Sequence, residues 1–408
     1  MKPEFSNFAA RLREAISSEG RAMRVPNSEF QNRDGDSFNS SLRDDAAFGK
    51  LALELFELQF KHNAAYQKIC KTRRLTPEVV GHWTRIPVVP AASFKELELT
   101  CLAPAARTAV FLSSGTTKQR PSRHFHNSES LAIYEASLWP WFEQNVFANS
   151  KFKIQNSKLV ILTPPPEQAP HSSLVHMFDV IRRKFGSLKS AFVGQVANDG
   201  SWALDFEAAL AALLLPASNP APRTLLLLGT AFSFVHLLDY LGERDLSFRL
   251  PPGSRVMETG GYKNRSRTMP RNELHALITE RLGIPQSHIV CEYGMSELSS
   301  QAYDGAIGRA GCPQPAGWRR GEDTSPYLRR NFHFPPWARA QVISPETNRE
   351  VADGETGLIR VFDLANVFSV MAIQMEDLGV RHGDGFELLG RAQFAEPRGC
   401  SLMSIESK

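Results

Sequence analysis

The chain has 408 residues, of which 42% are hydrophobic, 22% charged and 10% aromatic. This composition is typical of a globular protein and excludes a disordered, collagen-like or coiled-coil chain. The net charge of +4 is too small to indicate nucleic-acid binding, although it permits small anionic ligands.

The cysteines and the apolar segments bear on the cellular compartment. No two of the five cysteines have CxxC spacing, so we expect neither a disulfide framework nor a zinc ribbon, and free thiols fit a reducing compartment. The first residues, MKPEF, lack the apolar run of a signal peptide. Apolar stretches such as Leu210–Leu215 are too short to cross a bilayer, so we predict a cytoplasmic protein without a membrane span.

Residues 1–84 are predicted to form an N-terminal helical region that caps the molecule or contacts a partner. The segment Asn27–Ser41 is rich in Asn, Asp and Ser and is expected to be a loop. From Leu42 a helical pattern begins, in which Leu51, Leu55 and Leu58 recur on one face.

Residues 85–335 alternate short apolar runs with helical ones. We expect strands at Thr108–Leu112, Lys158–Thr163, Arg223–Leu228, Arg255–Glu258 and His288–Glu292. We expect helices at Ser128–Phe142, from the third strand through Tyr240, and at Met269–Leu282, with Pro270 in its first turn, Gly283 as its cap, and Leu274, Leu277, Ile278 and Leu282 buried. Apolar strands separated by helices indicate an α/β fold with a mostly parallel sheet flanked by helices.

Residues 336–391 are richer in strands, and residues 392–408 form a short tail that contains Cys400. The strand-like runs lie close together, which predicts a small antiparallel β subdomain. They are Ala340–Ser344, Gly357–Asp363, Val367–Gln374 and Phe386–Leu389.

A polar loop that directly follows the first predicted strand is the first candidate binding motif. It reads SSGTTKQRPS over Ser113–Ser122, and its hydroxyls and backbone amides could cradle phosphate oxygens while glycine permits close approach. The spacing is not that of a GxxxxGK[ST] P-loop, and an ordinary polar turn is the alternative. The candidate phosphate-binding residues are Ser113, Ser114, Gly115, Thr116, Thr117 and Lys118, with Arg120 and Arg123 adding positive charge.

Two further motifs follow predicted strands. The pair Gly260-Gly261 leaves room for a flat ligand against the backbone, although a simple turn would look similar. The run Tyr293–Glu297 (YGMSE) combines an aromatic ring that can stack on a base, the hydroxyl of Ser296 for phosphate, and the carboxylate of Glu297 for Mg²⁺. A turn with a surface glutamate is the alternative here.

Asp377 and Arg391 complete the set of candidates. A carboxylate accepts hydrogen bonds from both hydroxyls of a ribose, so Asp377 in the run EDLG is a candidate for that contact. Arg391, in a Gly-Arg pair, could add a second contact. Two histidines after the polar loop, His124 and His126, could touch phosphate or a ligand carboxylate, but we interpret them as structural.

The order of these motifs is more specific than any one of them. SSGTT, GG, YGMSE, DLG and GR resemble, in that order, the adenylate-forming superfamily of acyl-CoA synthetases and luciferases. A closer resemblance, over about residues 85–405, is to the acyl-protein synthetases of bacterial bioluminescence. It rests on IPV, SFK, SSGTT…PSRH, METGGYK, CEYGMSELSSQAY, DLAN, EDLG and ELLGRAQFAEPRGCSL.

This resemblance implies ATP- and Mg²⁺-dependent activation of a carboxylic acid, expected to be a fatty acid, to acyl-AMP. It assigns Ser113–Lys118 to the β- and γ-phosphates, Gly260 and Gly261 to the adenine or acyl pocket, Tyr293-Gly294 to adenine, Ser296 to phosphate, Glu297 to Mg²⁺, and Asp377 with Arg391 to the ribose. Ser296 replaces the family's usual threonine, and Lys118 stands where glycine is common.

The resemblance also implies a cysteine that accepts the acyl group and passes it to a partner such as a reductase or carrier protein. Cys400 occupies the matching place, and neighbouring Arg398 would favour its thiolate, although a structural cysteine is the alternative. Residues 392–408 are too few for the mobile lid domain, which would need about 50 residues. We therefore expect the lid and its lysine to be absent, with Lys95, Lys118 or Lys263 as a replacement cation.

Two other functions stay open on the sequence alone. One is an aryl- or acyl-CoA ligase-like enzyme, against which the missing lid argues. The other is a noncatalytic subunit that keeps a nucleotide pocket, against which the intact Glu297, Asp377 and Arg391 argue.

Overall fold

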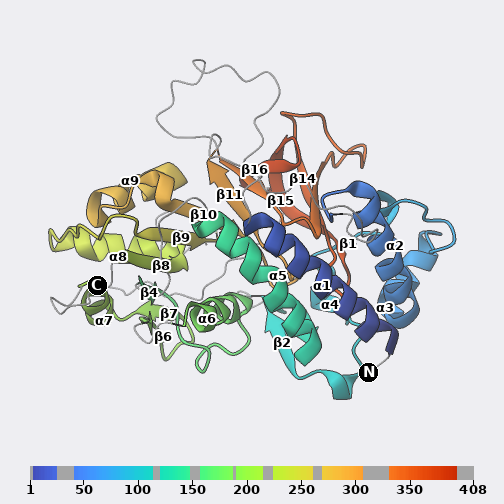
Figure 1. Ribbon diagram of the computed structural model, residues 1–408, viewed down its shortest axis with the longest axis horizontal. Helices are drawn as coiled ribbons and strands as arrows, with labels where there is room; N and C mark the ends of the chain where they lie inside the picture. The colour runs from blue at the N-terminus through green and yellow to red at the C-terminus, as the bar shows by residue number, and fades with distance from the viewer. Residues whose placement is uncertain are drawn as a thin grey trace.

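A 12-stranded mixed sheet forms the centre of the computed structural model (Figure 1). The structure describes residues 3–24, 41–113, 120–147, 157–186, 190–214, 224–260, 269–306 and 330–392. Its helices are α1 (Pro3–Arg24), α2 (Asp45–His62), α3 (Ala64–Thr72), α4 (Ser93–Glu96), α5 (Ser128–Phe147), α6 (Ser173–Phe185), α7 (Phe206–Leu213), α8 (Ala231–Glu243) and α9 (Arg271–Leu282).

The large sheet has a parallel half and an antiparallel half. The parallel half consists of β5 (Ala191–Phe192), β4 (Ser157–Ile161), β8 (Thr224–Thr230), β9 (Arg255–Thr259) and β10 (Ile289–Tyr293). Next to β10 follow, in spatial order, the antiparallel strands β11 (Ala302–Ala306), β12 (Arg330–His333), β16 (Gly385–Arg391), β15 (Ala372–His382), β14 (Thr356–Asp363) and β13 (Ala338–Ile343). A short strand, β1 (Val89–Pro90), pairs with β15 in parallel.

Two small hairpins lie beside the large sheet. One pairs β6 (Gly194–Val196) with β7 (Trp202–Leu204), and the other pairs β2 (Ala109–Leu112) with β3 (Arg123–His126). The predicted strand at Thr108–Leu112 therefore exists, but it does not join the parallel sheet as its position in the alternating pattern suggested. It pairs antiparallel with the strand on the far side of its own polar loop.

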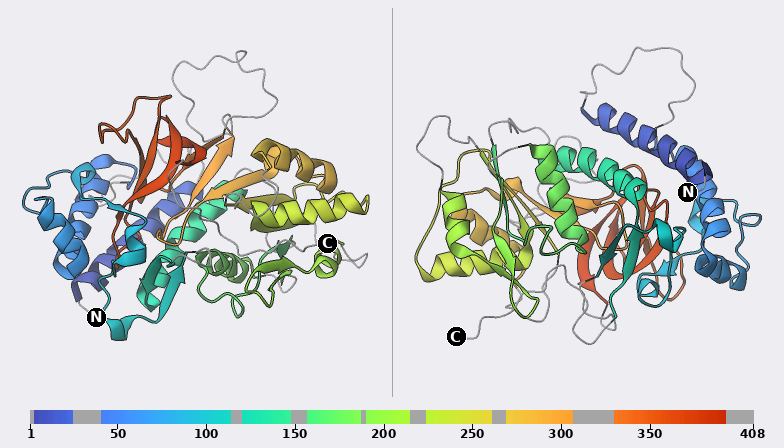
Figure 2. Two further views of the ribbon diagram at one scale, coloured as in Figure 1. Left: turned by 180° about the vertical axis from the view of Figure 1, so that it is seen from behind. Right: turned by 90° about the horizontal axis from the view of Figure 1, so that it is seen from below.

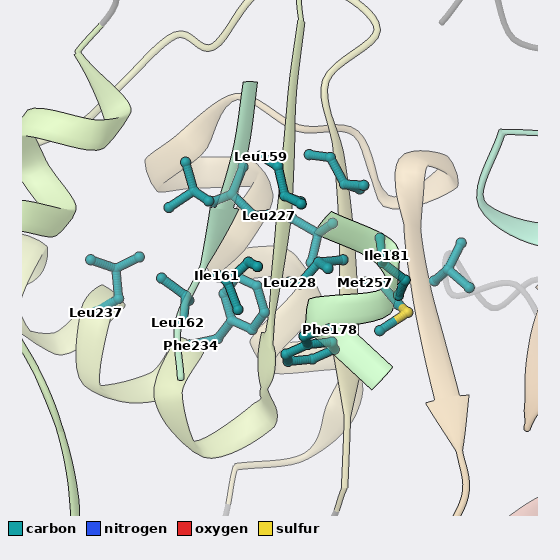
Figure 3. Packing of buried hydrophobic residues seen from close by; sticks show 14 of the residues in the cluster. Leu159, Ile161, Leu162, Phe178, Ile181, Leu227, Leu228, Phe234, Leu237 and Met257 are labelled. Atoms are coloured by element: carbon teal, nitrogen blue, oxygen red, sulfur yellow. The ribbon is translucent and has the colours of Figure 1, made fainter. Parts of the chain in front are cut away.

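The α/β fold class is confirmed, and so are the strands β4, β8, β9 and β10. All five residues of β9 and of β10 are buried, as expected for strands covered on both faces. The neighbouring strands follow the order β9-β8-β4-β5 across the sheet. The connection through α8 leads from β8 to β9, toward one end of this order, and the connection through α6 leads from β4 to β5, toward the other end. Right-handed crossovers then place α8 and α6 on opposite faces. Figure 3 shows the result, with Phe178 of α6 and Phe234 of α8 packed on the strands between them.

Three sequence predictions were wrong in detail. The run predicted as a strand at Val367–Gln374 becomes β15 only at Ala372, and the residues before it form a buried turn. The helix predicted from Met269 begins at Arg271, with Pro270 as its N-cap, and Leu277 is only half-buried. In α2 the buried face is rotated, so Leu55 is buried while Leu51 and Leu58 are only partly covered; the other buried residues are Phe48, Ala52, Phe56 and Gln59.

The N-terminal helices share a hydrophobic core with the antiparallel half of the sheet. Phe8 of α1, Phe48 and Phe56 of α2 and Phe362 of β14 belong to one buried cluster. A second cluster fills the parallel half. In the left view of Figure 2, the orange and red strands lie between the blue N-terminal helices and the yellow helices α8 and α9. No helix in the described ranges is long and apolar enough to span a bilayer.

Candidate active site

The second and third sequence motifs lie side by side at one edge of the sheet. Gly260 follows β9 and Tyr293 ends β10, and these parallel strands are in register, with Glu292 beside Thr259. Gly260 has a φ of +80°, a conformation that glycine adopts without strain. The carboxyl ends of parallel strands are where open α/β sheets bind ligands.

Asp377 and Arg391 join Tyr293 in one hydrogen-bonded group. The Tyr293 hydroxyl donates to Asp377 Oδ2 (2.9 Å), and Arg391 Nε donates to Asp377 Oδ1 (3.3 Å). Arg391 also reaches Glu376 Oε2 (2.9 Å) through Nη2. Asp377 and Arg391 are register partners on β15 and β16, which explains why residues 14 apart in the sequence meet. Burial, reinforced by the Asp377 charge, raises the pKa of Tyr293 well above its ordinary value, so its hydroxyl remains a donor.

This group has the donors and acceptors that a ribose or a phosphate would use. The Asp377 side chain is 13% exposed, and a carboxylate is the group that accepts hydrogen bonds from ribose hydroxyls. Arg391 Nη1 is buried and has no hydrogen-bond partner among the described residues. A nucleotide therefore fits the residues present here.

Ser296 and Glu297 form a buried turn directly after β10. The Ser296 hydroxyl donates to Glu297 Oε2 (3.0 Å), and His124 Nδ1 lies 2.9 Å from the Ser296 carbonyl oxygen. Because a carbonyl only accepts, Nδ1 carries the proton. Burial lowers the pKa of His124 to about 4, so the ring is neutral at pH 7. His124, interpreted as structural from the sequence, thus supports the turn.

The base of the polar loop reaches the same turn. Ser113 and Ser122 close the loop: the Ser113 amide donates to the Ser122 carbonyl (3.2 Å) and the Ser122 amide to the Ser113 hydroxyl (2.9 Å). His124 stands two residues farther along, so the loop begins and ends near Ser296. Arg120 and Arg123 each lie 3.7 Å from a glutamate, Glu96 and Glu98 respectively.

Part of the predicted site lies outside the described residues. Of the remaining candidates, Gly294 is the easiest to explain, because a Cβ there would collide with Glu292 Oε1. Lys95 lies buried on α4. The candidates outside the described residues are Ser114, Gly115, Thr116, Thr117, Lys118, Gly261, Lys263 and Cys400.

Sequence reasoning missed three buried polar residues next to the motifs. Glu292 accepts a hydrogen bond from the Thr259 hydroxyl, and Asp363 and Asn366 hold the chain after Glu297. The letters CEY and DLAN were part of the resemblance, but a single buried acid or amide has no spacing pattern that would reveal its partner.

The described residues contain no group of three or more His, Cys, Asp or Glu side chains able to hold a metal ion. Mg²⁺ is usually bound through one or two carboxylates together with substrate phosphates. A single buried carboxylate at Glu297, close to the base of the polar loop, fits an ion of that kind.

The sequence and the fold of this chain resemble those of known proteins. The family model described as acyl-protein synthetase, LuxE, matches residues 33–407. The long-chain-fatty-acid–luciferin-component ligase of Aliivibrio fischeri is 22% identical over 371 residues, and that of Vibrio harveyi is 21% identical over 368; each match covers 86% of both chains.

A solved structure resembles most of the fold. It is an open conformation of 2-hydroxyisobutyryl-CoA ligase in complex with 2-HIB-AMP and CoA, with a TM-score of 0.57 and 13% identity. The match covers 91% of this chain and 76% of that one, which shows a shared fold.

Proposed function

We infer the function from the premise that the chain belongs to the acyl-protein synthetase (LuxE) family. It is a ligase that activates an acyl group in an ATP-dependent reaction and transfers it. We further propose that the substrate is a fatty acid, that Mg²⁺ assists, and that the acyl group passes through Cys400 to a partner protein. The observation that carries the nucleotide site is the Tyr293–Asp377–Arg391 group.

In the first half-reaction, a carboxylate oxygen of the acid attacks the α-phosphorus of ATP, and pyrophosphate leaves with the electrons of the broken P–O bond. Such a displacement needs positioning and charge stabilisation rather than a protein nucleophile. We assign the ribose hydroxyls to Asp377, the adenine ring to Tyr293 with Gly294 and Gly260, and phosphate contacts to Ser296 and the loop Ser113–Lys118. Glu297 would hold Mg²⁺, which would neutralise phosphate charge.

In the second half-reaction, the Cys400 thiolate attacks the carbonyl carbon of acyl-AMP. A C–S bond forms, the C–O bond to AMP breaks, and AMP leaves with that electron pair, while the thiol proton goes to solvent. A partner protein then accepts the acyl group from Cys400. A reductase or a carrier protein is a suitable partner. The positive charge of Arg398, two residues before Cys400 in the sequence, would favour the ionised form of the thiol.

The first experiment measures pyrophosphate release from Mg·ATP with hydroxylamine as the acyl trap, across fatty acids of graded length and aromatic acids. We expect release with fatty acids, its loss in Glu297→Ala, and wild-type release in Glu346→Ala, which removes an exposed glutamate. A product that requires CoA would instead favour the CoA-ligase alternative. Nucleotide binding without release for any acid would contradict the adenylation step.

The role of Cys400 needs a separate measurement. A labelled fatty acid with ATP should leave a hydroxylamine-sensitive label on the wild-type chain and on Cys101→Ala, which changes a half-buried cysteine. Cys400→Ala should lose this label and keep pyrophosphate release. Equal labelling of Cys400→Ala and the wild type would rule out the thioester at this residue.

A further inference from the structure

The segment between β14 and β15 is buried throughout, although connections usually lie on the surface. All residues from Leu364 to Met371 are buried. A buried connection needs partners for its backbone N–H and C=O groups, because each unpaired group would cost stability. Some of these partners lie within the segment or at its ends, and others come from parts of the chain far away in sequence.

One glutamine of the N-terminal helices satisfies three of these backbone groups. Gln59 on α2, fully buried, donates through Nε2 to the carbonyl oxygens of Asn366 (2.8 Å) and Val367 (3.3 Å). Its Oε1 accepts from the Met371 amide (3.1 Å). On α1, the ring of Phe5 stacks on that of Phe368, with centroids 5.2 Å apart.

The same segment holds the turn that carries Glu297. Asn366 Nδ2 donates to the Glu297 carbonyl oxygen (2.9 Å). Asp363 Oδ2 accepts from the amides of Ser299 (3.0 Å) and Ser300 (2.8 Å). The side chains of Asp363 and Asn366 therefore hold the backbone from Glu297 to Ser300 by hydrogen bonds. The backbone carbonyl oxygen of Asn366 in turn accepts a hydrogen bond from Gln59.

We propose that Gln59 is a positioning residue for the Ser296–Glu297 turn and acts on it through Asn366. The proposal rests on the function assigned above, in which Ser296 and Glu297 contact the reacting phosphates and Mg²⁺. A shift of about 1 Å in a catalytic group can lower a rate on the order of 100-fold. The N-terminal helices thus set the geometry of the active site without contacting the substrate.

Gln59→Met tests this proposal, because it preserves length and shape and removes all three hydrogen bonds. The matched control is Gln67→Met on α3, whose Nε2 donates to the Phe60 carbonyl oxygen (3.2 Å). We expect Gln59→Met to lower kcat for pyrophosphate release about 10-fold or more and to leave KM for ATP within about two-fold. The control should keep the wild-type kcat. An unchanged kcat in folded Gln59→Met would overturn the proposal.

Coupling separates positioning from loss of stability. If Gln59 acts through Asn366, the double variant Gln59→Met/Asn366→Leu should be no slower than Asn366→Leu alone. Losses in kcat that multiply would show independent effects and contradict the proposed route. If Gln59→Met does not fold, Gln59→Asn, which keeps the amide but shortens its reach, should show the same loss of kcat in smaller degree; a wild-type kcat there would overturn the proposal.

A readout without activity distinguishes failure of this proposal from failure of the assigned function. The Leu298 amide donates to the Met295 carbonyl oxygen across the Ser296–Glu297 turn (3.1 Å), and it should exchange with deuterium faster in Gln59→Met than in Gln67→Met. If the wild type released no pyrophosphate but this difference appeared, the assigned function would fail and the Gln59–Asn366 connection would stand. Equal exchange in the two variants would refute the connection itself.

Discussion

Glu292 is a buried carboxyl group whose charge the surroundings oppose. It lies at the end of β10, is 5% exposed, and accepts a hydrogen bond from Thr259. Burial raises its pKa from 4.5 to about 7, against the effect of the Thr259 hydrogen bond and with a contribution from the nearby Glu258 charge. The neutral acid is therefore the favoured form in the folded chain below pH 7.

The stability of the protein should depend on this group. Between pH 4.5 and about 7 the folded chain binds more protons at Glu292 than the unfolded chain does, so this contribution to stability falls as pH rises and is fully lost above pH 7. A shift of this size corresponds to roughly 3 kcal/mol.

We therefore expect Glu292→Gln, which cannot ionise, to be more stable than the wild type by up to about 3 kcal/mol at pH 8 and by less than about 1 kcal/mol at pH 5. Urea unfolding at both pH values measures this difference. Glu280→Gln, at a 63% exposed side chain, is the control and should show no such change. Equal effects of Glu292→Gln at the two pH values would contradict the assignment.

The sequence predicted those site residues that belong to ordered motifs, and it did not predict residues that act through distant backbone contacts. Tyr293, Asp377 and Arg391 belong to motifs with a fixed order along the chain, and the structure brings them into contact. Gln59 forms hydrogen bonds to backbone atoms about 300 residues away, and Asn366 donates to the carbonyl oxygen of Glu297, 69 residues away. A glutamine in an amphipathic helix has no spacing that indicates such a partner.

The C-terminal end of α9 was predictable because a single residue type, glycine, determines it. The sequence predicts that Gly283 ends α9, and in the structure this residue has a φ of +69°. A side chain in this conformation costs roughly 1 kcal/mol. We expect Gly283→Ala to lower the free energy of unfolding by about that amount.

A second glycine provides the matched control. Gly242 lies in the last turn of α8, does not have a positive φ, and a Cβ there would meet no atom within 4 Å. Gly242→Ala should raise the free energy of unfolding by about 0.5 kcal/mol, because alanine loses less backbone entropy in a helix. Urea unfolding of both variants checks the opposite signs, and two shifts of equal sign would be inconsistent with the cap geometry.

Strand identity was predictable where strands are continuous and apolar, and strand pairing was not. β4 and β8 contain the buried apolar runs LVI and LLLL, which stand out in the sequence. β3, with the sequence RHFH, and β12, with RNFH, contain mostly polar residues and are strands because of their neighbours in the fold. The hairpin of β2 and β3 therefore could not be distinguished from two separate elements.

On the scale of the whole molecule, the N-terminal helices are part of the main fold. The sequence indicated helices in residues 1–84 but no motif that would place them. The structure packs them into one hydrophobic cluster with β13, β14 and the segment Leu364–Met371. Their partners are about 300 residues away, so no local pattern could have predicted these contacts.

Removal of residues 1–24 should therefore destabilise the entire chain. Phe5, Phe8, Leu12 and Ile16 of α1 are at most 2% exposed. Burial of each such side chain contributes about 1.5–3 kcal/mol, so their joint loss of roughly 6–12 kcal/mol approaches the whole stability of a typical domain. We expect the truncated chain to unfold at a much lower urea concentration and to lose pyrophosphate release, since Phe368 loses its stacking partner. A truncated chain with the wild-type unfolding midpoint would show that α1 is a separable addition, because only an independent element can be removed without uncovering a shared core.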